Sequence, residues 1–192
     1  MSRSIAFIPE EKLEKAMNVF WSKGYTASSL SDLTEAMAIN KSSLYNSFGD
    51  KYSLFKACLK HYGKLVEQDY ASSIDDQAKP IKNLENIIDG IFKTTTERAY
   101  SCMGIKTSFE LASDDKEIRA VIKTGHDKTI SLIQSFIKEA QSQGDIAAVR
   151  DSRNMAHFIF NAFAGMRQSF VIYGSKELVK GMAAELKAYL KA

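Results

Sequence analysis

The sequence contains only two cysteines, two prolines and one tryptophan among its 192 residues. Two cysteines cannot provide the disulfide framework of a small secreted domain, and 45% apolar with 26% charged residues is the balance of an ordinary reduced globular protein. No long apolar run opens the chain as a signal peptide would. The most apolar stretch, MAHFIFNAFAGM, is shorter than a membrane span and is interrupted by Asn161. We therefore expect a cytoplasmic protein.

Alternating strand patterns are also scarce, whereas apolar residues recur at helical spacing through most of the chain. Both prolines, Pro9 and Pro80, stand where a helix could begin. These features predict an all-α protein of about nine helices. The length suits one large domain or a small domain attached to a larger one.

The excess of positive charge is small but unevenly placed. Residues 1–64 hold nine Lys or Arg against six Asp or Glu, a net charge of +3, while residues 65–192 hold 17 of each sign. A basic head on a neutral body is typical of a nucleic-acid-binding protein, although an excess of three charges also arises by chance.

The N-terminal third predicts a helix-turn-helix. A first helix is expected from about Pro9 to Lys23 and a second from Ser29, where Ser29-Leu-Ser-Asp32 matches a capping box. After the gap Ala38-Ile39-Asn40, a third helix is expected over residues 41–48, followed by a longer helix from Lys51 with Asp50 as its cap. Two short helices joined by a brief turn and braced by a preceding helix form this motif, which is also used structurally.

The helix over residues 41–48 has one apolar side and one polar side. At about 100° per residue, Leu44 and Phe48 face the core, and Ser42 and Asn46 point away from it. Short polar side chains let a helix approach base edges, and Asn can pair with adenine. Residues on the flanks, such as Tyr45, can reach phosphates. The alternative is a solvated helical hairpin with ordinary caps.

The run from Ala16 to Tyr62 resembles the N-terminal domain of the TetR family of transcriptional regulators. The resemblance lies in the Phe-Trp-x-x-Gly-Tyr end of the first helix, the Ser-Leu-x-Asp-Leu second helix and the Leu-Tyr-x-x-Phe-x-x-Lys sequence that follows. It implies a DNA-binding domain over residues 1–50 and a helical effector-binding and dimerisation domain over residues 51–192. The residues implied to contact DNA are Ser28, Ser29, Lys41, Ser42, Ser43, Tyr45, Asn46 and Lys51.

Two positions depart from the family pattern. Ala38 stands in the turn where the family usually has Gly, and Ser42 stands where it often has Gly. An alanine in a left-handed turn conformation costs on the order of 1 kcal/mol, so we expect a tighter or differently closed turn.

The family resemblance extends to residues 153–173 and 177–190, which look similar to the helix pair through which TetR proteins dimerise. The first segment is apolar around much of its circumference, which favours a partner over a fully buried central helix without excluding the latter. The residues expected at the dimer interface are Phe158, Ala162, Gly165, Ser169, Leu178, Met182 and Leu186.

A ligand pocket among the middle helices is also implied. Candidate effector-binding residues are Ile88, Phe92, Cys102, Phe109, Ile133 and Phe160, although residues at such spacing also form ordinary cores. The segment YSCMGIKTSFEL resembles one found in a TetR subgroup that includes the N-ethylmaleimide-responsive repressor, so Cys102 is a candidate electrophile sensor or simply a buried thiol. Three scattered histidines give no metal-ligand spacing, and no metal or cofactor is expected.

We therefore expect a homodimeric repressor that a small molecule or an electrophile releases from a palindromic operator. One alternative is a helical DNA-binding dimer without an effector. Another is an enzyme with a helical body, although the sequence contains no catalytic triad, paired-carboxylate motif or glycine-rich phosphate loop.

Overall fold

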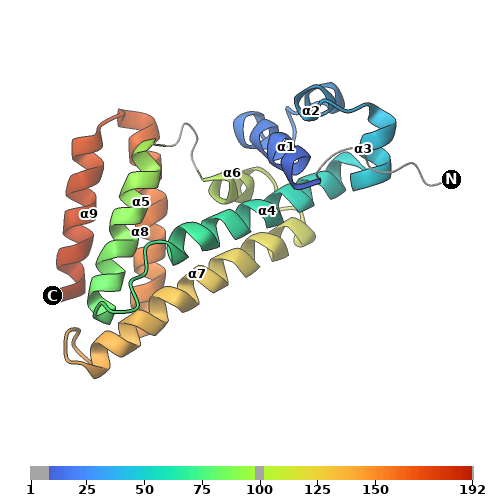
Figure 1. Ribbon diagram of the computed structural model, residues 1–192. Coiled ribbons are helices and arrows are strands. Elements are labelled where there is room, and N and C mark those ends of the chain that lie inside the picture. The colour runs from blue at the N-terminus through green and yellow to red at the C-terminus, as the bar shows by residue number, and fades with distance from the viewer. Residues whose placement is uncertain (1–8, 98–101, 192) are drawn as a thin grey trace. The chain divides into compact units, whose positions relative to one another are not determined.

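The computed structural model describes residues 9–97 and 102–191, which form nine helices and no strand (Figure 1). The all-α prediction is confirmed. The helices are α1 (Pro9–Lys23), α2 (Leu30–Met37), α3 (Lys41–Phe48), α4 (Lys51–Ala71), α5 (Pro80–Glu97), α6 (Met103–Glu110), α7 (Lys116–Ser142), α8 (Ser152–Tyr173) and α9 (Lys176–Lys191). Within the described residues, no helix combines the length and the apolar character that crossing a membrane requires.

The predicted starts of α2, α3 and α4 are confirmed by their caps. Ser29 and Asp32 form the expected capping box, and the Asn40 side chain accepts a hydrogen bond from the Ser43 amide. Asp50 accepts one from the Ser53 amide at the start of α4. Each cap satisfies an amide that has no partner inside its own helix, which is why these short polar residues fix the helix boundaries.

The described residues divide into two compact units at Leu65, Cys102 and Ile122, so that α4 and α7 each contribute to both. The first unit holds α1, α2, α3, the first part of α4, α6 and the start of α7. Its core contains Phe20 and Phe55, whose ring centroids lie 4.9 Å apart. The buried residues around them include Met17, Leu33, Met37, Leu44, Leu54, Cys58, Met103 and Ile118.

The first unit thus extends beyond the boundary expected at residue 50. Tyr52 of α4 donates a hydrogen bond to the Asp115 carboxylate, 2.7 Å from its Oδ2, and Lys56 pairs with Glu117 at 2.7 Å. The hydrogen bond to Asp115 raises the pKa of Tyr52 to about 12, with desolvation adding to the effect. Side-chain contacts therefore attach the start of α7 to the start of α4, a pairing that sequence spacing does not show.

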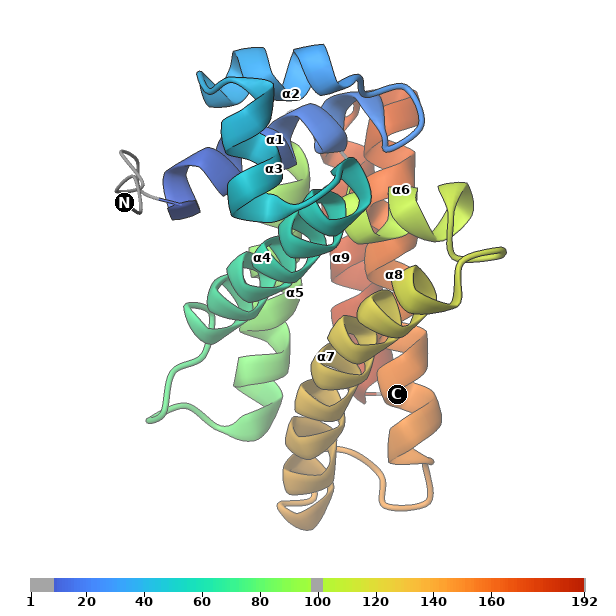
Figure 2. The same cartoon turned by 90° about the vertical axis from the view of Figure 1, so that its right-hand side faces the viewer.

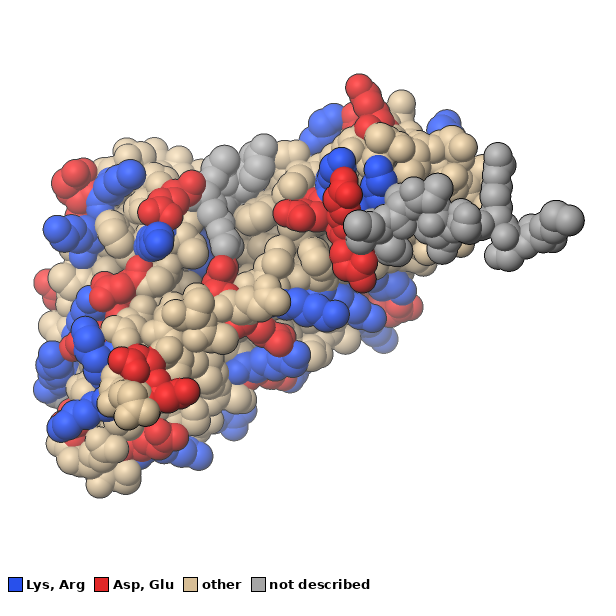
Figure 3. Space-filling view, viewed as in Figure 1, with Lys and Arg blue, Asp and Glu red and all other residues tan. Residues whose placement is uncertain are grey.

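The second unit is built on α5, α8 and α9, which lie side by side in both views (Figures 1 and 2). Apolar side chains from these helices and from the second part of α7 form one buried cluster that includes Ile88, Ile133, Ile159 and Phe163. On the outer surface, Lys187 of α9 pairs with Asp89 of α5, and Lys191 pairs with Glu85. Acidic and basic side chains are accordingly interspersed over α5 and α9 (Figure 3).

Candidate DNA interface

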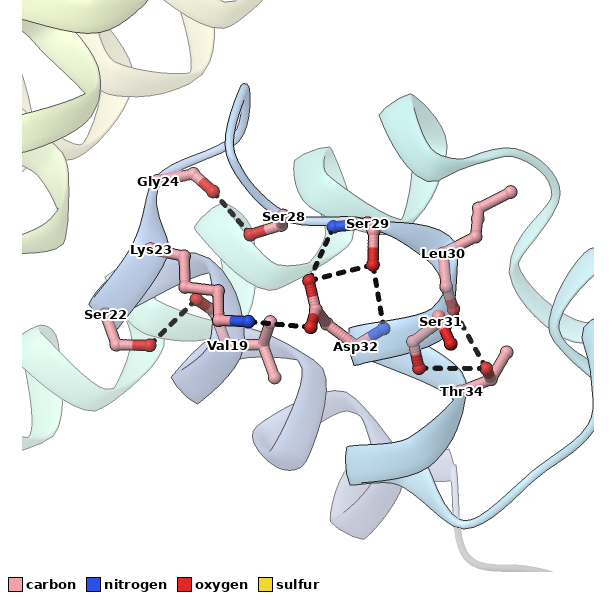
Figure 4. Close-up of polar contacts among 10 residues, drawn as sticks. All are labelled: Val19, Ser22, Lys23, Gly24, Ser28, Ser29, Leu30, Ser31, Asp32 and Thr34. Atoms are coloured by element: carbon pink, nitrogen blue, oxygen red, sulfur yellow. Dashed lines mark hydrogen bonds and ion pairs between the residues drawn. The ribbon is translucent and has the colours of Figure 1, made fainter.

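The N-terminus of α2 is organised around the Asp32 carboxylate. It accepts hydrogen bonds from the Ser29 amide and hydroxyl, both at 2.8 Å, and pairs with Lys23 at 2.6 Å (Figure 4). The Lys23 contact and then the Ser29 bonds lower the pKa of Asp32 to about 2. The carboxylate is therefore ionised at neutral pH and joins the end of α1 to the start of α2.

The turn between α2 and α3 contains the left-handed residue that the sequence predicted to be awkward. Ala38 has φ 48° and ψ 53°, and among the described residues it is the one non-glycine residue with a positive φ. The amides of Ala38 and Ile39 donate to the carbonyls of Glu35 and Thr34. The turn is therefore closed in the usual left-handed manner, and the expectation of a different closure was wrong: the chain accepts the strain at Ala38.

Helix α3 presents the expected polar face. Leu44 is fully buried, whereas Lys41, Ser42 and Asn46 are exposed and Tyr45 is 49% exposed. Ser43 is half-buried, and its amide donates to the Asn40 side chain. Small polar side chains thus lie outward along the helix, with a lysine at its start and a tyrosine beside them.

Lys51 begins α4 and lies against an aromatic ring. Its Nζ is 4.4 Å from the centroid of the Tyr25 ring, a distance at which a cation is attracted to the ring face. The amides in the first turn of α4 add a positive dipole end beside this ammonium. Lys51 was predicted from the sequence and Tyr25 was not, because no local pattern connects two residues so far apart in the chain.

Ser28 corrects one expectation. Its side chain is only 3% exposed, and its hydroxyl donates to the Gly24 carbonyl. This hydroxyl is committed to the α1–α2 turn and cannot contact a phosphate as the resemblance implied. The neighbouring Ser29 is exposed at the start of α2, so it is the serine available at this position.

The second unit contains a cavity of about 510 Å³ at the end of α4 and along α5. Its lining includes the apolar Val66 and Ile91 and the charged Asp69, Lys93 and Arg167. Burial raises the pKa of Tyr70, at the same cavity, to about 12, although Arg167 acts in the opposite direction.

None of the six residues expected to bind an effector lines this cavity. Ile88 and Ile133 are fully buried in the core of the second unit, with Phe92 and Phe160 packed against it. Cys102 is half-buried immediately before α6, whereas Cys58 is fully buried in the first unit, where burial raises its pKa. Phe109, on α6, is 86% exposed, because this short helix turns Met103 and Thr107 inward instead.

The residues expected at a dimer interface differ in burial. Phe158 and Leu178 are exposed, and Ala162, Gly165, Ser169 and Met182 are partly buried. Leu186, which was expected at the dimer interface, is instead buried in the core of its own unit. The end of α8 instead exposes Val171, Ile172 and Tyr173, which helical spacing alone did not identify.

Two protein-family models match the chain. The model described as bacterial regulatory proteins of the tetR family matches residues 13–58, and the model of a tetracyclin repressor-like C-terminal domain matches residues 80–186. The chain belongs to the TetR family. It is therefore a helix-turn-helix regulator of transcription, as the residues from Ala16 to Tyr62 led us to expect.

Curated relatives of this TetR protein include proteins that are named as repressors. The HTH-type transcriptional repressor ComR of Escherichia coli strain K12 is 28% identical over 167 residues, which cover 85% of this chain and 80% of ComR. The HTH-type transcriptional repressor DhaR of Mycobacterium sp. strain GP1 is 24% identical over 159 residues, covering 82% and 79% of the two chains.

Solved structures of TetR regulators share the fold. A cysteine mutant of the regulator CifR, in complex with a 26-bp operator DNA, has a TM-score of 0.85 at 24% identity, and the match covers 97% of this chain and 98% of that chain. The reduced form of NemR from E. coli has a TM-score of 0.83 at 16% identity, with 93% and 94% covered.

Proposed function

We propose that this TetR protein is a homodimeric repressor that reads a palindromic operator through α3. The observation that carries the proposal is the exposed polar face of α3, the helix that follows α2 in the helix-turn-helix and precedes α4. Ser42, Ser43 and Asn46 would lie against base edges, because their side chains are short enough for a helix to enter the major groove. The names of ComR and DhaR, both repressors, support the direction of regulation.

Phosphate contacts would come from the two sides of this face. Ser29 at the start of α2 and Lys51 at the start of α4 combine side-chain donors with helix N-termini, which attract anions. Lys41 and Tyr45 would add contacts on the flanks of α3. Such contacts fix the position of the helix in the groove, while the bases facing Asn46 supply specificity. The complex of CifR, which shares this fold, with duplex operator DNA supports DNA binding.

Dimerisation would use the apolar ends of α8 and α9. Val171, Ile172, Tyr173 and Leu178 expose apolar surface that a partner subunit would cover. A two-fold axis at this surface would place two copies of α3 on successive half-sites about one DNA turn apart.

An effector would bind in the second unit. It would release the operator by favouring a spacing of the two helix-turn-helix motifs of the dimer that does not match the DNA half-sites. The cavity beside Arg167 contains both charged and apolar side chains, which suits a small molecule with an apolar body and a polar group. Cys102 remains a second candidate, through reaction with an electrophile. A DNA-binding dimer without an effector is the alternative.

Selection of bound sequences from random duplex DNA, at physiological salt, tests the proposal. Enrichment of a palindrome supports a dimeric reader, and sedimentation of the protein with and without that duplex gives the stoichiometry. General, strongly salt-dependent binding without enrichment would rule out sequence reading by α3. The melting temperature of the protein, measured in the presence of each member of a metabolite panel, then tests for an effector. A ligand that binds the folded state raises this temperature.

A further inference from the structure

Helix α6 places two oppositely charged side chains, Lys106 and Glu110, one helical turn apart. Residues four apart lie on the same face of a helix, and this face adjoins Met103 and Thr107, which are buried in the first unit. Both charged side chains reach the end of α1 and the turn that follows it. We call this pair the α6 clamp.

The first arm of the clamp caps the C-terminus of α1. The ammonium of Lys106 donates to the carbonyl oxygens of Trp21 and Ser22, at 3.1 and 2.7 Å. Carbonyls in the last turn of a helix have no amide partner within the helix, and a cation there also opposes the negative end of the helix dipole. Lys106 therefore holds the main chain of α1 where that helix ends.

The second arm binds the amides of the next residues. The Glu110 carboxylate accepts from the Thr26 amide at 2.8 Å and from the Tyr25 amide at 3.2 Å. Desolvation raises the pKa of Glu110, but these amides and the Lys106 charge outweigh it, so the pKa lies below its ordinary value. The carboxylate is therefore charged at neutral pH, and each bond to it is charge-assisted.

Gly24 makes this approach possible. Its φ is +86°, and a Cβ built there would lie 2.8 Å from Oε2 of Glu110. A side chain at this position would therefore be strained by the backbone angle and would also displace the carboxylate. The glycine is required by the clamp as well as by the end of α1.

The segment that the clamp grips is connected to the proposed phosphate contacts. Lys23, within it, pairs with Asp32 and so fixes the cap that carries Ser29. Tyr25, whose amide the clamp binds, provides the ring under Lys51. A movement of α6 would therefore displace the supports of both Ser29 and Lys51.

We propose that Lys106 and Glu110 are positioning residues for DNA binding, through which α6 sets the placement of the α1–α2 turn and hence the operator affinity. This inference rests on the proposed function as a DNA-binding repressor. In this view α6 is linked to the DNA-binding residues through the Lys106 and Glu110 side chains. These hold two carbonyl oxygens and two amides at the end of α1 and in the turn that follows. If the contacts served only to stabilise the fold, their loss would lower the fraction of folded protein but leave the affinity of the folded protein unchanged.

The test compares the operator affinities of the full-length protein and its variants. For each protein, titration against a known concentration of operator gives the concentration of molecules that are able to bind DNA. We expect Glu110→Ala and Lys106→Met each to weaken operator binding about tenfold, since each removes two charge-assisted hydrogen bonds. Glu110→Gln should lie between, because its amide oxygen still accepts. The double variant should lose less than the product of the single losses, because both arms hold one turn.

Glu117→Ala is the matched control. Glu117 also forms an ion pair within the first unit, but its partner is Lys56 of α4 and not the α1–α2 turn. Its operator affinity should stay within about twofold of the original value, as expected for an exposed pair. Equal losses for Glu117→Ala and Glu110→Ala would overturn the inference, since the effect would then belong to any ion pair of the unit.

Hydrogen exchange at the Tyr25 and Thr26 amides gives an independent measurement. Exchange there should accelerate in Glu110→Ala and remain unchanged in Glu117→Ala. Faster exchange with unaltered operator affinity would refute the positioning role, and unaltered exchange would show that Glu110 does not hold these amides. If Glu110→Ala does not fold, Glu110→Gln and Lys106→Met provide the same comparison. Failure of the unmodified protein to select any DNA sequence is a separate result, which overturns the proposed function and this inference together.

Discussion

The ammonium of Lys51 lies 4.4 Å from the ring centroid of Tyr25, so a residue of the α1–α2 turn supports the first residue of α4. The Tyr25 ring is itself held by Phe55, whose ring centroid is 4.9 Å away. A lysine that is oriented before DNA arrives loses less side-chain entropy on binding a phosphate.

Replacing Tyr25 by leucine should therefore weaken operator binding by about two- to fivefold, the range expected for one cation–ring contact near the surface. Tyr25→Phe keeps the ring and should bind as the original protein does. Fluorescence anisotropy with a labelled operator measures both. Equal losses in the two variants would mean that the hydroxyl group, not the ring, is responsible.

Tyr45 and Asn46 are neighbours on α3 to which we assign different roles. Tyr45→Ala should weaken binding to every duplex and reduce the salt slope of log K, because a phosphate contact is lost. Asn46→Ala should mainly relax preference at particular base pairs, at a cost of about 1–3 kcal/mol for the preferred sequence. Binding to the operator and to single-base variants at several salt concentrations separates the two. Sequence-independent losses in both variants would contradict this division.

Ala38→Gly should stabilise the protein by about 0.5–1 kcal/mol, because glycine adopts the left-handed conformation without steric strain. This value is net of the greater conformational entropy that glycine gives to the unfolded chain. Ala36→Gly, two residues earlier and inside α2, should destabilise it by about 1 kcal/mol. Urea unfolding of both variants measures the difference. The same sign for both would show that the positive φ of Ala38 is not the cause.

The contribution of Asp32 should depend on pH. Its pKa is about 2 in the folded protein against an ordinary 3.8, so the ionised carboxylate stabilises the fold fully above pH 3.8. That contribution is lost as the pH falls toward 2. The melting temperature of Asp32→Asn should therefore lie below that of the original protein at neutral pH and converge with it in acid.

Lys23→Met should remove a large part of the same pH-dependent difference, since Lys23 is the main cause of the lowered pKa of Asp32. Melting curves recorded by circular dichroism across the acid range provide the comparison. A difference between Asp32→Asn and the original protein that stays constant down to pH 2 would exclude this explanation.

Ile172→Glu should dissociate the proposed dimer without unfolding the chain, because this side chain is 62% exposed on α8 within one subunit. Val149→Glu is the matched control, since Val149 is 93% exposed but precedes α8 in a turn, away from the expected interface. Sedimentation velocity should show a slower species for Ile172→Glu alone. Dissociation by both substitutions, or by neither, would argue against a dimer formed through this end of α8.

The sequence was sufficient to predict helix boundaries and helix faces where the contacts that determine them are local. Ser29 and Asn40 each cap a helix by binding an amide three residues away, so the boundaries of α2 and α3 were predicted from short patterns. Leu44 and Asn46 were placed on opposite sides of α3 by helical geometry alone.

It was insufficient where distant segments meet. Lys106 and Trp21 are 85 positions apart, and no periodicity indicates that they touch. Apolar spacing also cannot distinguish the core of one subunit from a surface, and for that reason Phe109 was expected inside and Leu186 at an interface. Ser28 was assigned to DNA by resemblance, whereas its side chain is buried and its hydroxyl donates to the carbonyl of Gly24.

Both arms of the α6 clamp end on main-chain atoms, which every amino acid supplies. Apart from Gly24, no particular side chain on the gripped turn is needed for α6 to hold it. Residues of α3 can therefore be exchanged to read a different operator while the same two side chains continue to hold the α1–α2 turn against α6. New binding specificities can accordingly arise in this protein, by evolution or by design, without rebuilding the connection that controls them.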